Sequence, residues 1–144
     1  MHRSEQDIRE LAALNADVRL CKGIYIEDAS IAYKERSEIQ NNYKKLLRLL
    51  VENNMNVHIA THDDVLIDDA REFIAKNNIS KDKYEFQMLL GVREEKRDAI
   101  IKEGHGMRIY VPFGEDWYGY STRRLKENPQ VAGYVMKAMF TGGK

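Results

Sequence analysis

Hydrophobic positions along the chain follow two alternating spacings, one typical of helices and one typical of strands. Helical spacing, with apolar residues three or four positions apart, predicts helices over residues 4–14, 37–52, 65–76, 93–103, 116–128 and 130–140. Short apolar runs between the helices predict strands over residues 18–23, 56–63, 84–91 and 107–112. The predicted order is therefore one helix followed by four strand–helix units.

Serine residues are predicted to begin the first two helices. Ser4, followed three residues later by Asp7, is a weak variant of the capping box. Ser37 is the predicted N-cap of the long second helix. On the charged helix over 93–103, Ala99, Ile100 and Ile101 form the predicted buried side.

Strict alternation of strands and helices with short connections predicts a parallel sheet. No G-x-G-x-x-G sequence follows any of the strands, which disfavours the dinucleotide-binding form of such a sheet. A complete (β/α)8 barrel takes about 250 residues, so four units make half of one. The predicted fold class is α/β, and residues 1–144 form a single partial (β/α) barrel domain.

Composition narrows the classes of function. The chain has 23 basic and 23 acidic residues, and the two signs are interspersed, so neither a nucleic-acid surface nor a polybasic anchor is predicted. Cys21 is the single cysteine, which excludes an internal disulfide and fits a reducing, cytoplasmic setting. No His/Cys cluster has the spacing of metal ligands, and no apolar run approaches the roughly 20 residues that span a bilayer. Peripheral contact with a membrane stays compatible with this composition.

An arginine pair on the helix predicted near residue 120 is the first candidate for chemistry. Tyr120 precedes Arg123 and Arg124 by three and four residues, so one phenol ring can lie beside both guanidinium groups. Arginine binds carboxylates through two parallel hydrogen bonds, and the ring can supply an apolar wall. The alternative is that both arginines are ordinary solvated charges.

The carboxyl ends of the four predicted strands carry most of the remaining polar chemistry. In a barrel these ends share one rim, where functional residues gather. The residues at these strand ends are Arg19, Lys22, Gly23, Thr61, His62, Asp63, Gln87, Leu89, Tyr110 and Pro112. Taken alone, Arg19 and Lys22 fit surface charges and His62 fits a hydrogen-bonded structural residue. Gln87 lies inside an apolar strand, and a functional role is harder to dismiss there because a buried amide needs hydrogen-bond partners.

Five motifs in order make the chain resemble the flavin-dependent proline dehydrogenases. The motifs run from Arg19 to Tyr25, from Ala60 to Asp63, from Glu85 to Gly91, from Arg108 to Gly114 and from Tyr120 to Glu127. Together the resemblance reaches from residue 4 to about residue 130. It implies the C-terminal half of a distorted (β/α)8 TIM-like barrel, from the fourth helix to the end.

The resemblance also implies an activity, which is the FAD-dependent oxidation of L-proline to 1-pyrroline-5-carboxylate with a membrane quinone as electron acceptor. Arg19 would be the catalytic residue beside the flavin N5 edge. The implied substrate-binding residues are Arg123, Arg124, Tyr120, Tyr110 and Leu89. The implied FAD-binding residues are Arg19, Lys22, Gly23, Ile24, Thr61, His62 and Gln87.

Some features of the family pattern are missing. Its first four strands have no counterpart, and neither have the lysine and the aspartate that line the other side of the proline pocket. Leu90 stands where an aromatic residue or a histidine is expected, which leaves the shape of the flavin pocket open. We therefore expect a fragment that needs the missing barrel half or a homo-oligomer. A catalytically inactive half-barrel that serves as a binding or assembly module is the alternative.

Overall fold

The computed structural model describes residues 1–23, 27–115, 119 and 122. In chain order, its elements are α1 (Ser4–Ala12), β1 (Val18–Cys21), α2 (Arg36–Glu52), β2 (Val57–Ala60), α3 (Asp64–Lys76), the 3-10 turn η1 (Lys81–Lys83), β3 (Tyr84–Leu89), α4 (Glu94–Lys102) and β4 (Met107–Tyr110). The helices predicted over 116–128 and 130–140 lie outside the described residues, apart from Gly119 and Thr122.

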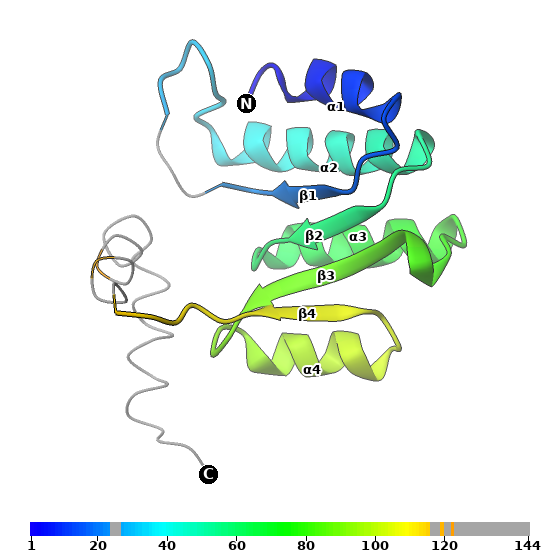
Figure 1. Ribbon diagram of the computed structural model, residues 1–144, viewed down its shortest axis with the longest axis vertical. Helices are drawn as coiled ribbons and strands as arrows, with labels where there is room; N and C mark the ends of the chain where they lie inside the picture. Colours follow the sequence, from blue (N-terminus) through cyan, green and yellow to red (C-terminus); the bar gives the residue numbers. More distant parts are fainter. Residues whose placement is uncertain (24–26, 116–118, 120–121, 123–144) are drawn as a thin grey trace.

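The four strands form one parallel sheet in sequential order, β1-β2-β3-β4. Leu20, Ile59, Phe86 and Met107 stand side by side in one row across it. Figure 1 shows a helix after each of the first three strands, with α2, α3 and α4 following one another along the sheet. The α/β prediction is confirmed, and the arrangement is that of half a barrel.

The hydrophobic core lies between the helices and one face of the sheet. From the strands, Leu20, Val57, Ile59, Tyr84, Phe86 and Met88 are buried on this face. From the helices, the most buried side chains are Leu47, Leu50, Leu66, Ile67, Ala70 and Ile100. The predicted buried side of α4 is only partly right, because Ile100 is fully buried whereas Ile101 is 49% exposed.

Both predicted serine caps are wrong. Ser4 is already the first residue of α1, and the residue before it, Arg3, has no capping side-chain bond. Instead Arg3 forms an ion pair with Asp7 one turn later, at 2.9 Å. At α2 the N-cap is Glu35, whose backbone N–H donates to the Glu38 carboxylate at 3.4 Å. A carboxylate in the first turn complements the positive end of the helix dipole, so it can replace a serine there.

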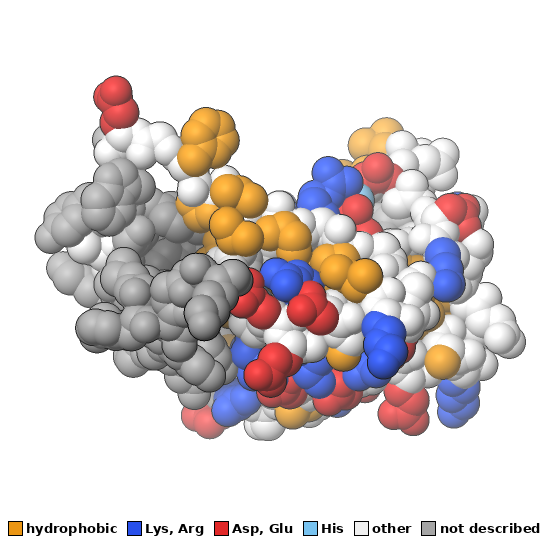
Figure 2. All heavy atoms as spheres, turned by 90° about the horizontal axis from the view of Figure 1, so that it is seen from below, with side chains coloured by type: hydrophobic (Ala, Val, Ile, Leu, Met, Phe, Trp, Pro, Cys, Tyr) orange, Lys and Arg blue, Asp and Glu red, His pale blue; other side chains and the backbone are white. Residues whose placement is uncertain are grey.

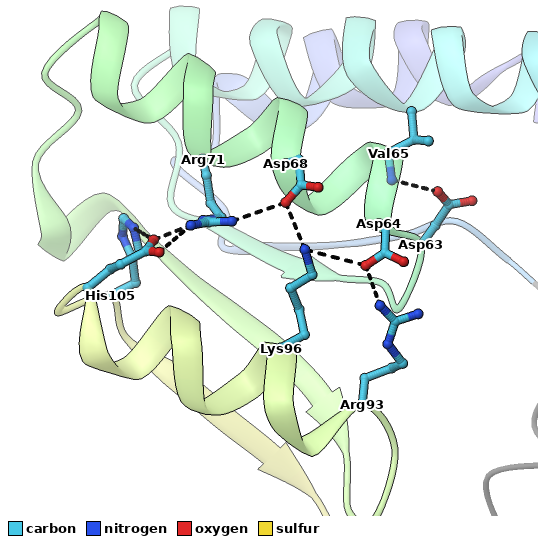
Figure 3. Close-up of polar contacts among 9 residues, drawn as sticks. Asp63, Asp64, Val65, Asp68, Arg71, Arg93, Lys96 and His105 are labelled. Carbon is cyan, nitrogen blue, oxygen red and sulfur yellow. Dashed lines mark hydrogen bonds and ion pairs between the residues drawn. The ribbon is translucent and has the colours of Figure 1, made fainter.

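Helices α3 and α4 are joined by a ladder of alternating charges (Figure 3). Asp64, in the first turn of α3, pairs with Arg93 and Lys96. Lys96 also reaches Asp68 at 2.9 Å, and Asp68 pairs with Arg71 at 3.0 Å. Exposed ion pairs contribute little one at a time, so the ladder orients the two helices more than it stabilises them.

Strands β1 and β4 are the two edges of the sheet within the described residues. At the end of β4 the exposed apolar side chains are Tyr110, Val111 and Phe113, and Phe113 is 93% exposed. Figure 2 shows hydrophobic side chains gathered on the face seen from below, next to the grey residues. Among the described helices, none is long and apolar enough to cross a membrane.

The burial of Ile67 and Ile101 allows a matched test of the core. Ile67→Ala should lower the free energy of unfolding by about 2–5 kcal/mol, because it removes a fully buried side chain and leaves a cavity. Ile101→Ala is the same change on a neighbouring helix at a half-exposed position, and it should change stability by less than about 1 kcal/mol. Urea unfolding followed by circular dichroism compares the two. Equal losses would contradict the assignment of the core to this face.

Candidate functional site

The second face of the sheet is polar. Because side chains alternate across a strand, the residues between the buried ones point to this opposite face, which we call the inner face. The strand pairing aligns Arg19 with His58 and Glu85, and Gln87 with Arg108. These five side chains therefore form two neighbouring rows across the sheet. Their charge and hydrogen-bonding capacity set this face apart from the apolar one that packs on the helices.

A small pocket of about 140 Å³ lies on the inner face at the carboxyl end of the strands. It is lined by Arg19, Gln87, Arg108, Ile109, Tyr110 and Val111. The Arg19 guanidinium lies over the Tyr110 ring, 5.8 Å from its centre. Strands in a flat sheet are about 4.8 Å apart, so β1 and β4 would be separated by about 14 Å. The curl of the sheet and the length of Arg19 together bring the first and last strands to one pocket.

Gln87 is held in place by Glu85. The Gln87 Nε2 donates to Glu85 Oε1 at 2.6 Å, two residues along β3. Arg108 of β4 donates to the same carboxylate at 2.6 and 3.1 Å, and His58 of β2 contacts it at 2.8 Å. The Arg108 hydrogen bond does most to lower the pKa of Glu85, to about 2, against the opposing effect of burial. The carboxylate is therefore ionised at neutral pH.

Asp63 organises the rim where β1 and β2 end. Its side chain is only 4% exposed and accepts hydrogen bonds from Lys22 Nζ at 2.6 Å and from Gln40 at 3.1 and 3.2 Å. It also caps α3 through the Val65 N–H at 3.1 Å (Figure 3). Arg36 lies 3.4 Å from the same carboxylate. Burial acts to raise the pKa of Asp63, but the hydrogen bonds and positive charges outweigh it and hold the pKa below its usual value.

Two rim residues make structural hydrogen bonds. His62 Nε2 accepts from the Leu89 N–H at 2.9 Å and so ties the end of β2 to the end of β3. Because this nitrogen accepts, a neutral His62 ring carries its proton on Nδ1. Thr61 is 5% exposed, and its hydroxyl accepts from the Asp63 N–H at 3.2 Å. These contacts fix both side chains at the rim where β2 ends.

The structure thus brings together part of the predicted site. Arg19, Gln87 and Tyr110 share the pocket, whereas Lys22 lies at the Asp63 cluster. Gly23 follows β1 with φ +83°, a left-handed conformation that glycine adopts without strain, and a side-chain carbon built there would meet no atom within 4 Å. The predicted residues Ile24, Tyr120, Arg123 and Arg124 lie outside the described residues.

Sequence reasoning missed three members of the site. Arg108 lines the pocket, and Glu85 and His58 complete the hydrogen-bond network around Gln87. One signal was present, because Glu85 and Gln87 are two polar residues at alternate positions of an otherwise apolar strand. What the sequence could not show was the register that places Arg108 beside them.

A larger hollow of about 470 Å³ lies between α1 and α2 and is a poorer candidate for a site. Most of its charged side chains pair with one another or with α3, as in the contacts of Arg9 and Lys45 with Glu5 and of Arg48 with Asp69. The inner-face pocket instead offers a cation, an amide and an aromatic ring within one small space. Such a set suits a flat, polar ring whose edge carries hydrogen-bonding groups and whose reduced form is electron-rich.

Comparison with known proteins gives one consistent family. The family model described as proline dehydrogenase matches residues 4–137. The chain is 44% identical over 139 residues to proline dehydrogenase 2 of Bacillus subtilis, covering 96% of this chain and 46% of the relative. It is 37% identical over 142 residues to the proline dehydrogenase of Deinococcus radiodurans, covering 99% of this chain and 46% of the relative. The chain therefore spans about half the length of these curated relatives.

A solved structure shows the same fold. It is the crystal structure of proline utilization A from Bdellovibrio bacteriovorus inactivated by N-propargylglycine. It superimposes with a TM-score of 0.70 at 30% sequence identity, covering 78% of this chain and 14% of that chain. The half-barrel arrangement predicted from the alternating strands and helices thus has a counterpart of known structure.

Replacing the Asp63 carboxylate tests the rim cluster, by which we mean Asp63 with Lys22, Arg36 and Gln40. Asp63→Asn should lower the free energy of unfolding at pH 7 by about 1–3 kcal/mol, because the amide can still cap α3 but no longer pairs with Lys22. Because folding lowers the pKa of Asp63, its carboxylate contributes fully to stability above the ordinary aspartate pKa of 3.8. This contribution is lost as the pH falls below that value and the carboxylate becomes protonated. Urea unfolding at pH 7 and at pH 3 should therefore show the difference from wild type shrinking.

Asp68→Asn provides the matched control, because Asp68 also pairs with two cations but is 54% exposed. It should cost less than about 1 kcal/mol at either pH. A loss as large as that of Asp63→Asn would mean that burial does not distinguish the rim cluster.

Proposed function

Because the chain belongs to the proline dehydrogenase family, we propose that it forms the C-terminal half of a (β/α)8 barrel that oxidises L-proline to 1-pyrroline-5-carboxylate with FAD. The observation that carries the proposal is the meeting of Arg19, Gln87 and Tyr110 in one pocket on the inner face. These three residues come from β1, β3 and β4. The family resemblance assigns Arg19 and Gln87 to the cofactor and Tyr110 to the substrate, which supports a site at this pocket.

In this reaction the proline ring loses a hydride from carbon and a proton from nitrogen, which leaves a C=N bond. FAD, when bound, supplies the hydride acceptor. Arg19 would hold a fixed positive charge beside it, and a fixed charge stabilises developing negative charge without having to reorganise. Gln87 would hydrogen-bond the edge of the ring system, and Lys22, Gly23, Ile24, Thr61 and His62 would complete the cofactor site at the strand ends.

Substrate binding is proposed for residues near the end of β4 and beyond it. Tyr110, which is 41% exposed, and Leu89 would form apolar walls for the proline ring. Arg123 and Arg124 would bind the substrate carboxylate through paired hydrogen bonds, with Tyr120 beside them. The support for these three residues is the motif and its helical spacing.

The proposed barrel needs a second set of strands. In the described part, β1 and β4 are sheet edges, and unpaired edges seek partners. We propose that the missing barrel half, or a second copy of the chain, pairs with these edges and closes the inner face. The chain's share of its relatives, 46% of their length, supports the first of these.

The electron acceptor and the location are proposed from the family resemblance. A membrane quinone would take the electrons from the reduced flavin. A protein acting in the cytoplasm, at the inner face of the cell membrane, would have access to both L-proline and quinone. The absence of disulfide-forming cysteine pairs supports the reducing compartment.

The competing proposal is an inactive half-barrel that serves as a binding or assembly module. Among the residues that the structure describes, no further strand pairs with β1 or β4, which favours this proposal because a half-barrel alone lacks the other side of the substrate pocket. The two proposals agree that the inner face is the functional surface. They differ in whether a bound flavin is reduced by proline.

A visible absorbance spectrum distinguishes these proposals. The chain is incubated with FAD, desalted, and measured before and after anaerobic addition of L-proline. A retained flavin band that bleaches with L-proline, but not with glycine, is expected if the chain is the catalytic half of a proline dehydrogenase barrel. A retained band that does not bleach supports the binding module, and loss of flavin on desalting contradicts a cofactor site that is complete within this chain.

Arg19→Gln tests the proposed catalytic charge. Loss of a fixed cation next to the flavin should slow flavin reduction by L-proline about 10- to 100-fold, as measured by anaerobic stopped-flow absorbance. Arg9→Gln is the control, because Arg9 lies on α1 and pairs with Glu5 on the outer surface. Equal rates of flavin reduction in the two variants would contradict a catalytic role for Arg19.

A further inference from the structure

Three adjacent strands direct polar side chains to the single carboxylate of Glu85. His58 reaches it from β2, Gln87 from β3 itself, and Arg108 from β4. The Glu85 side chain is 21% exposed, so most of its surface is covered by these partners and the sheet. Only Gln87 among the three partners is a neutral amide, and it is also the most buried, at 9% exposure.

The chemistry of this cluster decides which way the Gln87 amide faces. An ionised carboxylate can only accept hydrogen bonds, so the atom of Gln87 that approaches Glu85 Oε1 at 2.6 Å must be the nitrogen. The reversed amide would place two oxygens at hydrogen-bond distance without a hydrogen between them. Arg108 keeps the carboxylate charged and fixed through two hydrogen bonds of its own.

We propose that Glu85, held by Arg108 and His58, is a positioning residue that fixes Gln87 with its carbonyl oxygen available to the flavin. The inference rests on the proposed cofactor site, because Gln87 lines the inner-face pocket. An oriented Oε1 is a hydrogen-bond acceptor and therefore selects an N–H on the edge of the flavin ring. A freely rotating amide would offer a donor or an acceptor with equal ease.

The alternative is that Glu85 only ties the three strands together. Both roles predict that Glu85→Gln lowers stability, so stability alone does not separate them. The two roles differ at Gln87, because only the positioning role acts through the orientation of that amide.

The first experiment reads Gln87 directly in the chain without cofactor. In ¹H–¹⁵N spectra, assigned with Gln87→Asn, the two side-chain amide protons should be well separated, with one shifted downfield by the carboxylate. Glu85→Gln should collapse this separation toward that of an exposed glutamine and speed amide exchange. If Glu85→Gln does not fold, the wild-type spectrum alone still shows whether the Gln87 amide is fixed. A separation and an exchange rate in the wild type that match those of an exposed glutamine would overturn the proposal.

Glu103→Gln is the matched control. Glu103 also binds one arginine, Arg71, through two guanidinium nitrogens and lies 3.5 Å from one histidine, His105. It stands at the C-terminal end of α4 and does not line the inner-face pocket. The same substitution there should leave the Gln87 signals unchanged.

The second experiment measures FAD binding by flavin fluorescence for wild type, Glu85→Gln, Gln87→Ala and the double variant. Loss of one oriented hydrogen bond should weaken the Kd about fivefold to tenfold in Glu85→Gln. In the double variant, Glu85→Gln should add nothing to the effect of Gln87→Ala, because a residue that acts through Gln87 has no effect once it is gone. Glu103→Gln should bind FAD like wild type.

The outcomes separate the inference from the function on which it rests. Additive effects of Glu85→Gln and Gln87→Ala, or unchanged FAD binding by Glu85→Gln, would overturn the positioning role while leaving the proposed function intact. A wild-type chain that binds no FAD would overturn the cofactor site and this inference with it. Non-additive weakening together with the change in the Gln87 amide signals would support both.

Discussion

The in-register parallel pairing of four strands is the constraint on which the rest of this structure depends. Pairing Leu20 with Ile59 and Phe86 places one apolar row against the helices. The same register necessarily aligns the intervening residues on the opposite face. A slip of one residue in any strand would reverse both faces of that strand, so the core and the candidate site are fixed by a single geometric choice.

On the inner face, this register places the charged Glu85 carboxylate where neighbouring side chains largely cover it. One carboxylate on the central strand β3 receives partners from both neighbouring strands, so its charge is stabilised by the sheet rather than by solvent. The rim follows the same design, with Asp63 nearly buried among Lys22, Arg36 and Gln40. At each cluster a carboxylate orients a side chain assigned to the cofactor, Gln87 in one case and Lys22 in the other.

The two carboxylate clusters differ from the pocket in how far they depend on a closed barrel. The clusters around Glu85 and Asp63 are complete within residues 22–108, so the described half-barrel supplies their internal hydrogen bonds itself. The pocket between Arg19 and Tyr110 is different, because it lies on the uncovered inner face and is small. A second half of the barrel would cover this pocket, whereas the two clusters need no such cover.

The sequence by itself determined the order of helices and strands, the parallel α/β class and the polar strand ends, because periodicity is a local property of the chain. It also placed Arg19, Gln87 and Tyr110 at one rim, through their positions near strand ends and the resemblance that followed. It misplaced the helix caps, because serine is the commoner N-cap and was preferred at Ser37, although Glu35 and Glu38 have the three-residue spacing of a capping box. Only the tertiary structure decided the partners of Glu85 and Lys22, because Arg108, His58 and Asp63 lie 23 to 41 residues from the groups they contact and meet them through the register and curl of the sheet.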